Sequence, residues 1–242
     1  MLRHTIFITL FISNFFISSA QTTHSVKKDK TATNHAVPTD NTPIDKIVSF
    51  TGDYFSTGYK VGDTVPDITF YSRDNKAVCL SDLLKDTIPV LLVSGSYTCP
   101  NFRFRANDLN RMTEYYKGKI NTYLIYTLEA HPNNAINPYM DSICVGPANE
   151  RQGILYPQHA TYGDRKAMVD TMKAKMAIRP TVLIDGPGNR WWKEFGPAPN
   201  IAYLIDTKRI VRAKNVSLNA MGDNMWCDID HYLGTRSGKC PR

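Results

Sequence analysis

The stretch that decides the fold reads VLLVSGSYTCP over residues 90–100. Its first four residues are all apolar, which indicates a short strand buried on both faces of a sheet. Cys99 and Pro100 then open a helical pattern, where proline fits because its missing N–H costs nothing in the first turn. A cysteine there meets unpaired backbone N–H groups and the positive end of the helix dipole, and both favour the thiolate. We therefore predict that Cys99 is a nucleophile that ionises near neutral pH; the alternative is a small buried hydrophobic residue at a strand end.

The first twenty residues predict a signal peptide. Arg3 supplies a positive start, residues 6–17 an apolar stretch, and residues 18–20 the small side chains of a cleavage site. The apolar stretch is too short for a comfortable membrane span, and we find no other candidate span in the sequence. We expect an exported protein, in the periplasm or outside the cell, with an uncleaved anchor as the alternative.

The rest of the chain divides into a tether and one domain. Residues 21–45 predict a flexible tether, since they are rich in Thr, Asn, Lys, Asp and Pro and poor in large apolar residues. Residues 46–242 suit a single domain with its own core. The formal net charge of +7 is modest and the basic residues are scattered, so we expect no nucleic-acid partner.

The cysteine pattern argues against a dithiol motif and against a metal site. The five cysteines are Cys79, Cys99, Cys144, Cys227 and Cys240, and their odd number leaves at least one thiol unpaired within the chain. The last two flank a short C-terminal segment and could close a loop there. No pair has the two-residue spacing of a dithiol, and no spacing suits zinc, so we expect no bound metal.

Hydrophobic periodicity and turn residues predict the other elements. Residues 130–159 show no sustained period, and an unstructured stretch of this length is either a functional loop or an incorrect assignment. The expected ranges are 67–71 and 77–80 for a hairpin, 81–84 for a brief helix, 100–117, 161–178 and 219–233 for helices, 121–128 and 181–185 for strands, 191–195 for a helical turn, and 201–206 with 209–216 for a second hairpin.

This order predicts an α/β protein with a thioredoxin-like fold, an N-terminal β-hairpin extension and a long loop insertion. Crossover helices between parallel strands would bring Cys99 to the carboxyl end of a central strand, the usual place for chemistry in such sheets. Pro199 precedes a late strand where this fold often carries a cis-proline that faces the nucleophile. An ordinary trans-proline at the start of a strand is the equal alternative.

Three segments together resemble the iodothyronine deiodinases and their bacterial relatives. The first is GSYTCP at residues 95–100 with Phe102 and Arg103, and the second is YTLEAHP at residues 126–132. The third is PQH at residues 157–159, followed by Asp164 and Arg165. The resemblance extends over roughly residues 61–216.

The resemblance implies a set of site residues. Cys99 would be the nucleophile that attacks the halogen of an iodinated phenol. The others are Ser96 and Thr98 beside it, the catalytic Tyr126, Glu129 and His131, and the substrate-binding His159 and Arg165. The position of Pro199 in the expected fold makes it a further substrate-binding candidate. Reductive removal of an aryl halide needs a soft nucleophile and an acid for the ring carbon. We expect the His131 imidazole to deliver that proton, with the neighbouring Glu129 orienting it and raising its pKa.

Two departures from the family pattern affect the expected substrate. Cysteine stands where the vertebrate enzymes have the more reactive selenocysteine. The family's substrate-binding arginine falls on Ile201, which cannot pair with a carboxylate. We therefore expect simple halogenated phenols to be preferred over thyroid hormone, in a pocket lined by His159 and the aromatic pair Trp191 and Trp192.

The sequence thus predicts a thiol-dependent oxidoreductase that performs reductive dehalogenation of a small aromatic molecule. We expect no bound cofactor and an external thiol reductant, either a thiol protein or a small thiol, and we leave open a homodimer. A peroxiredoxin-like thiol peroxidase is the first alternative, because Ser96 lies three residues before Cys99, although Leu92 stands where its loop proline would be. The second is a non-catalytic thioredoxin-fold module that binds a partner through residues 130–159.

Overall fold

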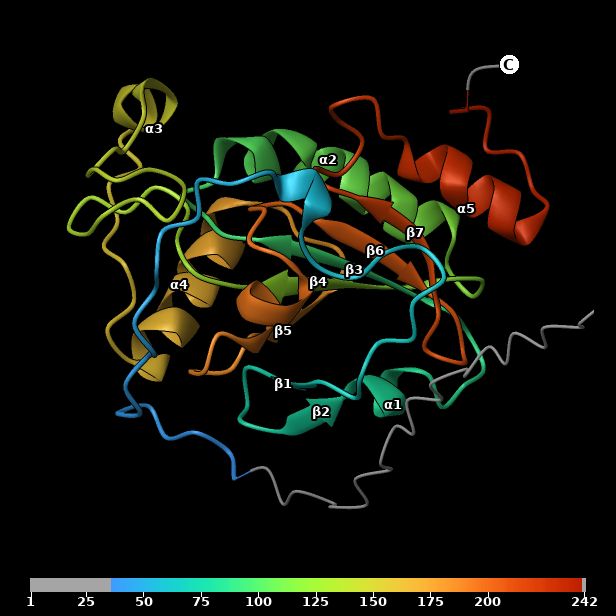
Figure 1. The fold of residues 1–242 in the computed structure, drawn as a ribbon, viewed down its shortest axis with the longest axis horizontal. Helices are drawn as coiled ribbons and strands as arrows, with labels where there is room; N and C mark the ends of the chain where they lie inside the picture. The colour runs from blue at the N-terminus through green and yellow to red at the C-terminus, as the bar shows by residue number, and fades with distance from the viewer. Residues whose placement is uncertain (1–35, 241–242) are drawn as a thin grey trace, which may run out of the picture. The chain divides into compact units, whose positions relative to one another are not determined.

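The computed structural model describes residues 36–240, so the predicted signal peptide lies outside the described chain. A seven-stranded sheet crosses this part in the order β2-β1-β5-β4-β3-β6-β7 (Figure 1). Strands β3, β4 and β5 run parallel, whereas β6 is antiparallel to β3, and β1 is antiparallel to both β2 and β5. The strands are β1 (Thr69–Tyr71), β2 (Ala77–Cys79), β3 (Val90–Gly95), β4 (Asn121–Tyr126), β5 (Thr181–Ile184), β6 (Ala202–Ile205) and β7 (Val211–Asn215).

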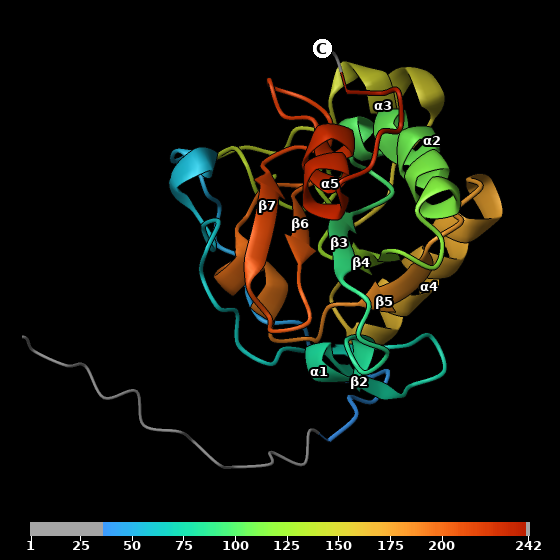
Figure 2. The same cartoon turned by 90° about the vertical axis from the view of Figure 1, so that its right-hand side faces the viewer.

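The two faces of the sheet carry different layers (Figure 2). Leu91 and Val93 of β3 pack with α2 (Pro100–Tyr115), α4 (Tyr162–Lys175) and α5 (Met225–Leu233). Val90 and Leu92 point to the other face, where η2 (Trp191–Phe195) and α1 (Leu80–Leu83) cover them. This alternation follows from the two-residue period of a strand, and it buries the apolar run of β3 on both sides. The remaining short helices are η1 (Tyr54–Ser56) and α3 (Pro147–Gln152).

The predicted α/β thioredoxin-like fold is confirmed, including the N-terminal hairpin of β1 and β2 and the hairpin of β6 and β7. Cys99 lies beyond the carboxyl end of the central strand β3 and is the N-cap residue of α2. The long loop contains the short helix α3, which the sequence did not predict. The last helix starts at Met225 rather than at 219, because residues 219 and 221 adopt positive φ angles of 51° and 56°.

The cysteines and Pro199 have defined covalent states in the structure. The disulfide between Cys227 and Cys240 forms, as their positions around a short C-terminal segment predicted. Cys79, Cys99 and Cys144 are free thiols. Pro199 has a trans peptide bond, since residues 36–240 contain no cis peptide, so the cis alternative is wrong.

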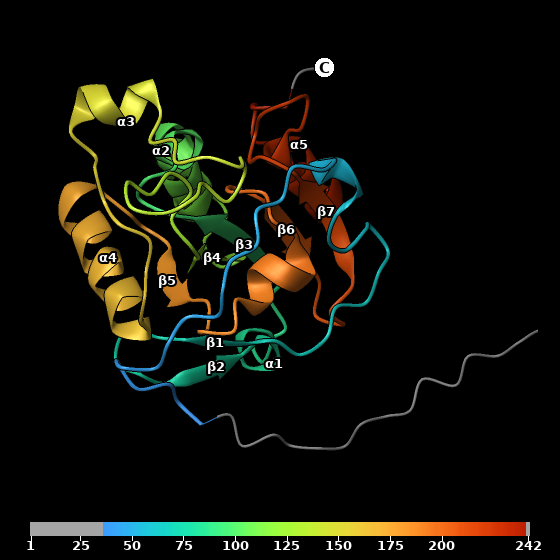
Figure 3. The same ribbon diagram turned by 60° about the vertical axis from the view of Figure 1, so that its left-hand side comes forward.

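The folded part begins earlier than position 46. Within the predicted tether, Ile44 N donates to Ala160 O at 3.0 Å and Asp45 N donates to Pro187 O at 2.9 Å. Asp40 also forms a 2.5 Å ion pair with the nearly buried Lys166 of α4. Figure 3 shows this segment leading past α4 toward η1. Composition alone pointed to a tether, but tertiary hydrogen bonds fix its second half on the domain.

None of the helices between residues 36 and 240 combines the length and the hydrophobicity that a transmembrane span requires.

Candidate functional site

Cys99 occupies the junction of β3 and α2 that its sequence context predicts. Its Sγ accepts a hydrogen bond from Phe102 N at 3.3 Å, and Pro100 follows at the first helical position. Gly95 ends the strand, and a Cβ built there would lie 2.5 Å from the Phe102 ring. Glycine therefore lets the first turn of α2 pack tightly against the end of β3.

The ionisation of Cys99 differs from the prediction. The residue is only 1% exposed, and this burial raises the pKa of the thiol to about 11. The backbone N–H groups of Phe102 and Asn101 and the charge of Arg103 act to lower it, but they do not offset the loss of water. The predicted low pKa is therefore wrong, and Cys99 is a protonated thiol at neutral pH in this conformation.

A buried carboxylate joins the loop after β3 to the loop after β4. Glu129 accepts hydrogen bonds from Thr98 N at 2.9 Å, from Thr98 Oγ1 at 2.6 Å and from the hydroxyl of Tyr126. Ser96 Oγ accepts a bond from Ala130 N at 3.2 Å, which fastens the same two loops. The structure thus brings together Ser96, Thr98, Tyr126 and Glu129, as the motifs predicted.

Glu129 remains ionised despite its burial. Desolvation acts to raise its pKa, but the facing His159 and the hydrogen bonds from Thr98 and Tyr126 outweigh that effect and lower it. A fixed negative charge therefore lies within range of Cys99, where it contributes to raising the pKa of the thiol.

His131 is not oriented by Glu129, so this part of the prediction is wrong. The main-chain N–H of His131 donates to Thr98 Oγ1 at 3.0 Å, which holds the backbone. The ring instead faces the long loop, with Nδ1 at 3.0 Å from Asn137 Nδ2 and 3.3 Å from Cys144 O. Burial lowers the pKa of His131, opposite to the predicted direction. Glu129 does not raise this pKa, because its carboxylate faces Thr98, Tyr126 and His159 instead.

His159 and Arg165 lie beneath the site and support the carboxylate. His159 Nε2 is 3.3 Å from Glu129 Oε1, and its Nδ1 is 3.3 Å from Arg165 Nε. Because arginine only donates, the His159 proton is on Nε2 and faces Glu129. Arg165 is fully buried and also donates to Asp185 O, Gly186 O and Asn189 Oδ1. Neither side chain lines the cavity described next.

An uncharged cavity of about 270 Å³ opens beside the first turn of α2. It brings together His131 and Pro199, two of the predicted site residues, with Asn101, which follows Cys99 by two positions. Loop residues 130–159 and the segment before α5 supply much of the wall. The lining residues are Tyr54, Asn101, His131, Asn137, Tyr139, Met140, Ala198, Pro199, Val216, Ser217 and Met221.

The predicted aromatic wall of Trp191 and Trp192 is corrected by the structure. Trp191 is 1% exposed and stacks on Phe195 in the core, at 4.4 Å between ring centroids. Trp192 contacts Tyr139, with ring centroids 5.4 Å apart, but lines a neighbouring hollow. Tyr54 and Tyr139 provide the aromatic surface instead.

Arg103 and Asn149 complete the site, and the sequence did not assign them a role. Arg103 donates to Tyr97 O at 2.7 Å and to Asn149 Oδ1 at 2.6 Å. Asn149 of α3 in turn donates to Thr98 O at 2.8 Å. These bonds tie the long loop to the cysteine loop. Arg103 stood in the first motif, whereas for Asn149 the only signal was the length of the loop.

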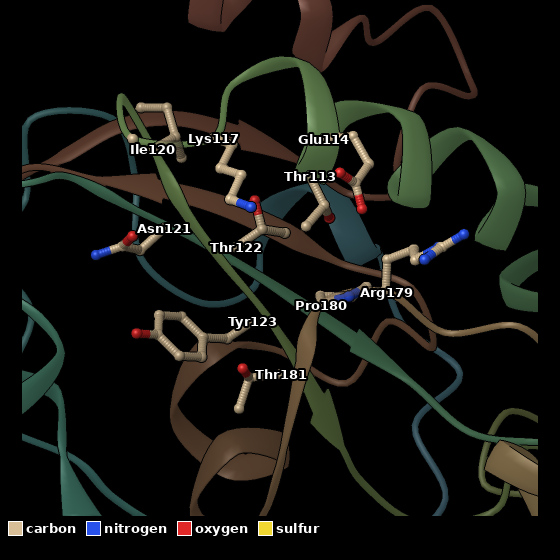
Figure 4. Close-up of a pocket in the computed structure, with 11 residues that line it drawn as sticks. Thr113, Glu114, Lys117, Ile120, Asn121, Thr122, Tyr123, Arg179, Pro180 and Thr181 are labelled. Carbon is tan, nitrogen blue, oxygen red and sulfur yellow. The ribbon is translucent and has the colours of Figure 1, made fainter.

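A second cavity of about 260 Å³ lies at the amino ends of the parallel strands, opposite to the end that carries Cys99 (Figure 4). Its walls come from the end of α2 and the amino ends of β4 and β5, with Glu114, Thr122 and Arg179 among the labelled side chains. It contains none of the predicted site residues. Among residues 36–240, no three His, Cys, Asp or Glu side chains are grouped to hold a metal ion.

Comparison with known proteins gives a family match over most of the chain. The family described as iodothyronine deiodinase matches residues 18–215. This range includes all three motifs and every residue of the candidate site except three from the cavity wall, Val216, Ser217 and Met221.

Solved structures with a similar arrangement are distant in sequence. A putative thiol:disulfide interchange protein DsbE from Chlorobium tepidum has 19% identity and a TM-score of 0.49, covering 72% of this chain and 99% of its own. A DsbF homologue from Corynebacterium diphtheriae has 16% identity and a TM-score of 0.47, covering 77% and 99%. A peroxiredoxin-like protein from Aquifex aeolicus has 11% identity and a TM-score of 0.39, covering 67% and 78%. Likeness at this level carries no conclusion about activity.

Proposed function

Because the chain belongs to the iodothyronine deiodinase family, we propose that it is a thiol-dependent reductive dehalogenase of small aromatic molecules with Cys99 as nucleophile. The observation that carries the proposal is the placement of Cys99 at the start of α2, beside the ionised Glu129 network, where Asn101 of the same helical turn lines an uncharged aromatic cavity. Membership of the family alone does not define the substrate of this chain. The size and lining of the cavity restrict the range of substrates that we propose.

The proposed reaction consumes one aryl halide and two external thiols. Cys99 Sγ takes the halogen while the ring carbon gains the hydrogen, which leaves an arene and a sulfenyl halide. An external thiol then attacks Sγ, expels halide and a proton, and forms a mixed disulfide. A second external thiol restores Cys99 and leaves as the oxidised disulfide, so the reductant supplies both electrons.

The state of Cys99 suits both parts of the first step. The protonated thiol carries the hydrogen that the ring carbon needs. Transfer of that proton to the ring carbon leaves a thiolate, and a thiolate of high pKa is a stronger nucleophile toward the halogen than one of low pKa. Glu129 holds Tyr126 and Thr98, the residue before Cys99, in place, and its charge contributes to the high pKa of Cys99.

The cavity favours a single halogenated phenol ring without a carboxylate. Its volume of about 270 Å³ lies at the lower limit of pockets for drug-sized ligands, which start at about 300 Å³. No Lys or Arg is among its described lining residues, and Ile201, which matches the family's arginine, is fully buried in the core. The rings of Tyr54 and Tyr139 offer an apolar wall for an aromatic substrate.

The test is halide release from an iodinated phenol and from thyroid hormone, each with dithiothreitol as reductant. We expect release from the phenol, faster than from the hormone, and its loss in Cys99→Ser. Cys79→Ser is the matched control, because Cys79 lies in the β1–β2 hairpin away from the cavity and should retain turnover. Activity that survives in Cys99→Ser would overturn the role of this residue.

Two assays separate the alternatives. Hydrogen peroxide consumption without halide release would establish the thiol peroxidase, and no turnover of either kind would favour the binding module.

His131→Ala should lower dehalogenation roughly a hundredfold, the scale for loss of an acid–base or hydrogen-bonding group, with little change in melting temperature. A collapse of stability instead would make His131 structural.

A further inference from the structure

Asn137 is a buried amide in the long loop whose orientation is fixed at both ends. The residue is 0% exposed, and its Oδ1 accepts a hydrogen bond from Tyr139 N at 2.8 Å. Its Nδ2 donates to Cys144 O at 3.0 Å and lies 3.0 Å from His131 Nδ1. A flipped amide would set Oδ1 against the Cys144 carbonyl and Nδ2 against the Tyr139 N–H. Both contacts would be repulsive, so the amide has one allowed orientation.

We propose that Asn137 is a positioning residue that holds His131 as the neutral tautomer with its proton on Nε2. The Nδ2 group has two hydrogens, and its two neighbours are Cys144 O and His131 Nδ1. One hydrogen goes to the carbonyl, so the other points at the ring nitrogen. His131 Nδ1 must then be an acceptor, which leaves the ring proton on Nε2.

The other protonation states conflict with this geometry. A proton on Nδ1 could reach Cys144 O, but at 3.3 Å, and it would face the N–H of Asn137 at 3.0 Å. The doubly protonated ring has the same conflict. Burial lowers the pKa of His131, the Cys144 carbonyl acts to raise it, and the positive charge of Arg103 acts in the same direction as burial, so the net shift is downward and disfavours the imidazolium. Gly146 borders the same Nδ1 edge without a side chain.

The consequence for the site rests on the proposed function. His131 and Asn137 both line the cavity, and no protein group within residues 36–240 hydrogen-bonds to His131 Nε2. A neutral Nε2–H is a hydrogen-bond donor and a poor acid. His131 would therefore bind the oxygen of a halogenated phenol, and the hydrogen for the ring carbon would come from the Cys99 thiol. This assigns the imidazole a different role from proton delivery.

The first test needs no activity, and its decisive measurement is made on the wild-type protein. Nitrogen-15 spectra of the histidine side chains report which ring nitrogen is protonated, and comparison with His131→Gln assigns the signals. In the wild-type protein at pH 7 we expect His131 to carry its proton on Nε2. A proton on Nδ1, or an imidazolium, would overturn the proposal. Failure of halide release would refute the proposed function and leave this measurement intact.

The second test reverses the polarity of the partner. In Asn137→Asp the carboxylate accepts from Nδ1–H, so the pKa of His131 measured by the same spectra should rise by about one pH unit or more. Asn133→Asp places the same charge on an exposed position of the same loop and should shift it far less. Equal pKa values in these two folded variants would refute the contact. If Asn137→Asp does not fold, the wild-type tautomer still decides.

Discussion

The high pKa of Cys99 makes the stability of the protein depend on pH in a direction that can be measured. In the unfolded chain the thiol has its ordinary pKa of 9.0, and in the folded protein the pKa is about 11. Between these values the folded state keeps a proton that the unfolded chain loses. The stabilisation is therefore complete below about pH 9 and is lost as the pH rises toward 11.

The size of the effect follows from the same two values. Each pH unit in this interval costs about 1.4 kcal/mol, so the folded protein loses about 1.4 kcal/mol by pH 10, relative to pH 7, and about 3 kcal/mol in total. Tyrosine and lysine titration also changes stability in this range. Those contributions cancel in a comparison with Cys99→Ser, whose hydroxyl does not ionise there.

The assay is urea unfolding of the wild-type protein and Cys99→Ser at pH 7 to 10. The difference in free energy of unfolding between the two proteins should change by about 1.4 kcal/mol, in the direction that weakens the wild type at high pH. Alkylation of Cys99 with iodoacetamide should show its midpoint above pH 10. A flat difference, or a wild type that gains stability with pH, would refute the argument and restore the thiolate expected from the helix start.

Three further predictions test the framework of the site. Thr98→Val should cost about 2–3 kcal/mol of stability, because it leaves a buried carboxylate short of a charge-assisted hydrogen bond; Thr98→Ser keeps the hydroxyl, and equal losses in both would contradict this account. Arg103→Met should release the long loop and speed its cleavage by thermolysin, a protease that does not depend on arginine or lysine for cleavage. Arg111→Met, an exposed change on the same helix, should not, and unchanged cleavage in Arg103→Met would remove the proposed tie. Cys227→Ser should lower stability by up to about 3 kcal/mol through loss of a disulfide with a sequence separation of 13, with dehalogenation retained; lost activity in a folded variant would contradict its structural role.

The three motifs located the site because each stands at the carboxyl end of a strand or at a helix start. Parallel strands end at one edge of the sheet, so the residues after β3 and β4 must meet there. That rule was enough to group Cys99, Thr98, Tyr126 and Glu129. It could not tell which atoms of the group touch, and the predicted contact between Glu129 and His131 failed for that reason.

The sequence by itself determined the features that depend on neighbouring residues. The apolar run of β3, the proline after Cys99 and the helix period of α2 act within one element, so strand, cap and helix could be predicted from local physics. Only the tertiary structure decided the chemistry of Cys99 and His131. The pKa of a thiol depends on how much water the rest of the fold removes, and the protonation of His131 depends on Asn137 six residues further along an irregular loop. Neither solvent access nor the path of such a loop follows any period of the sequence.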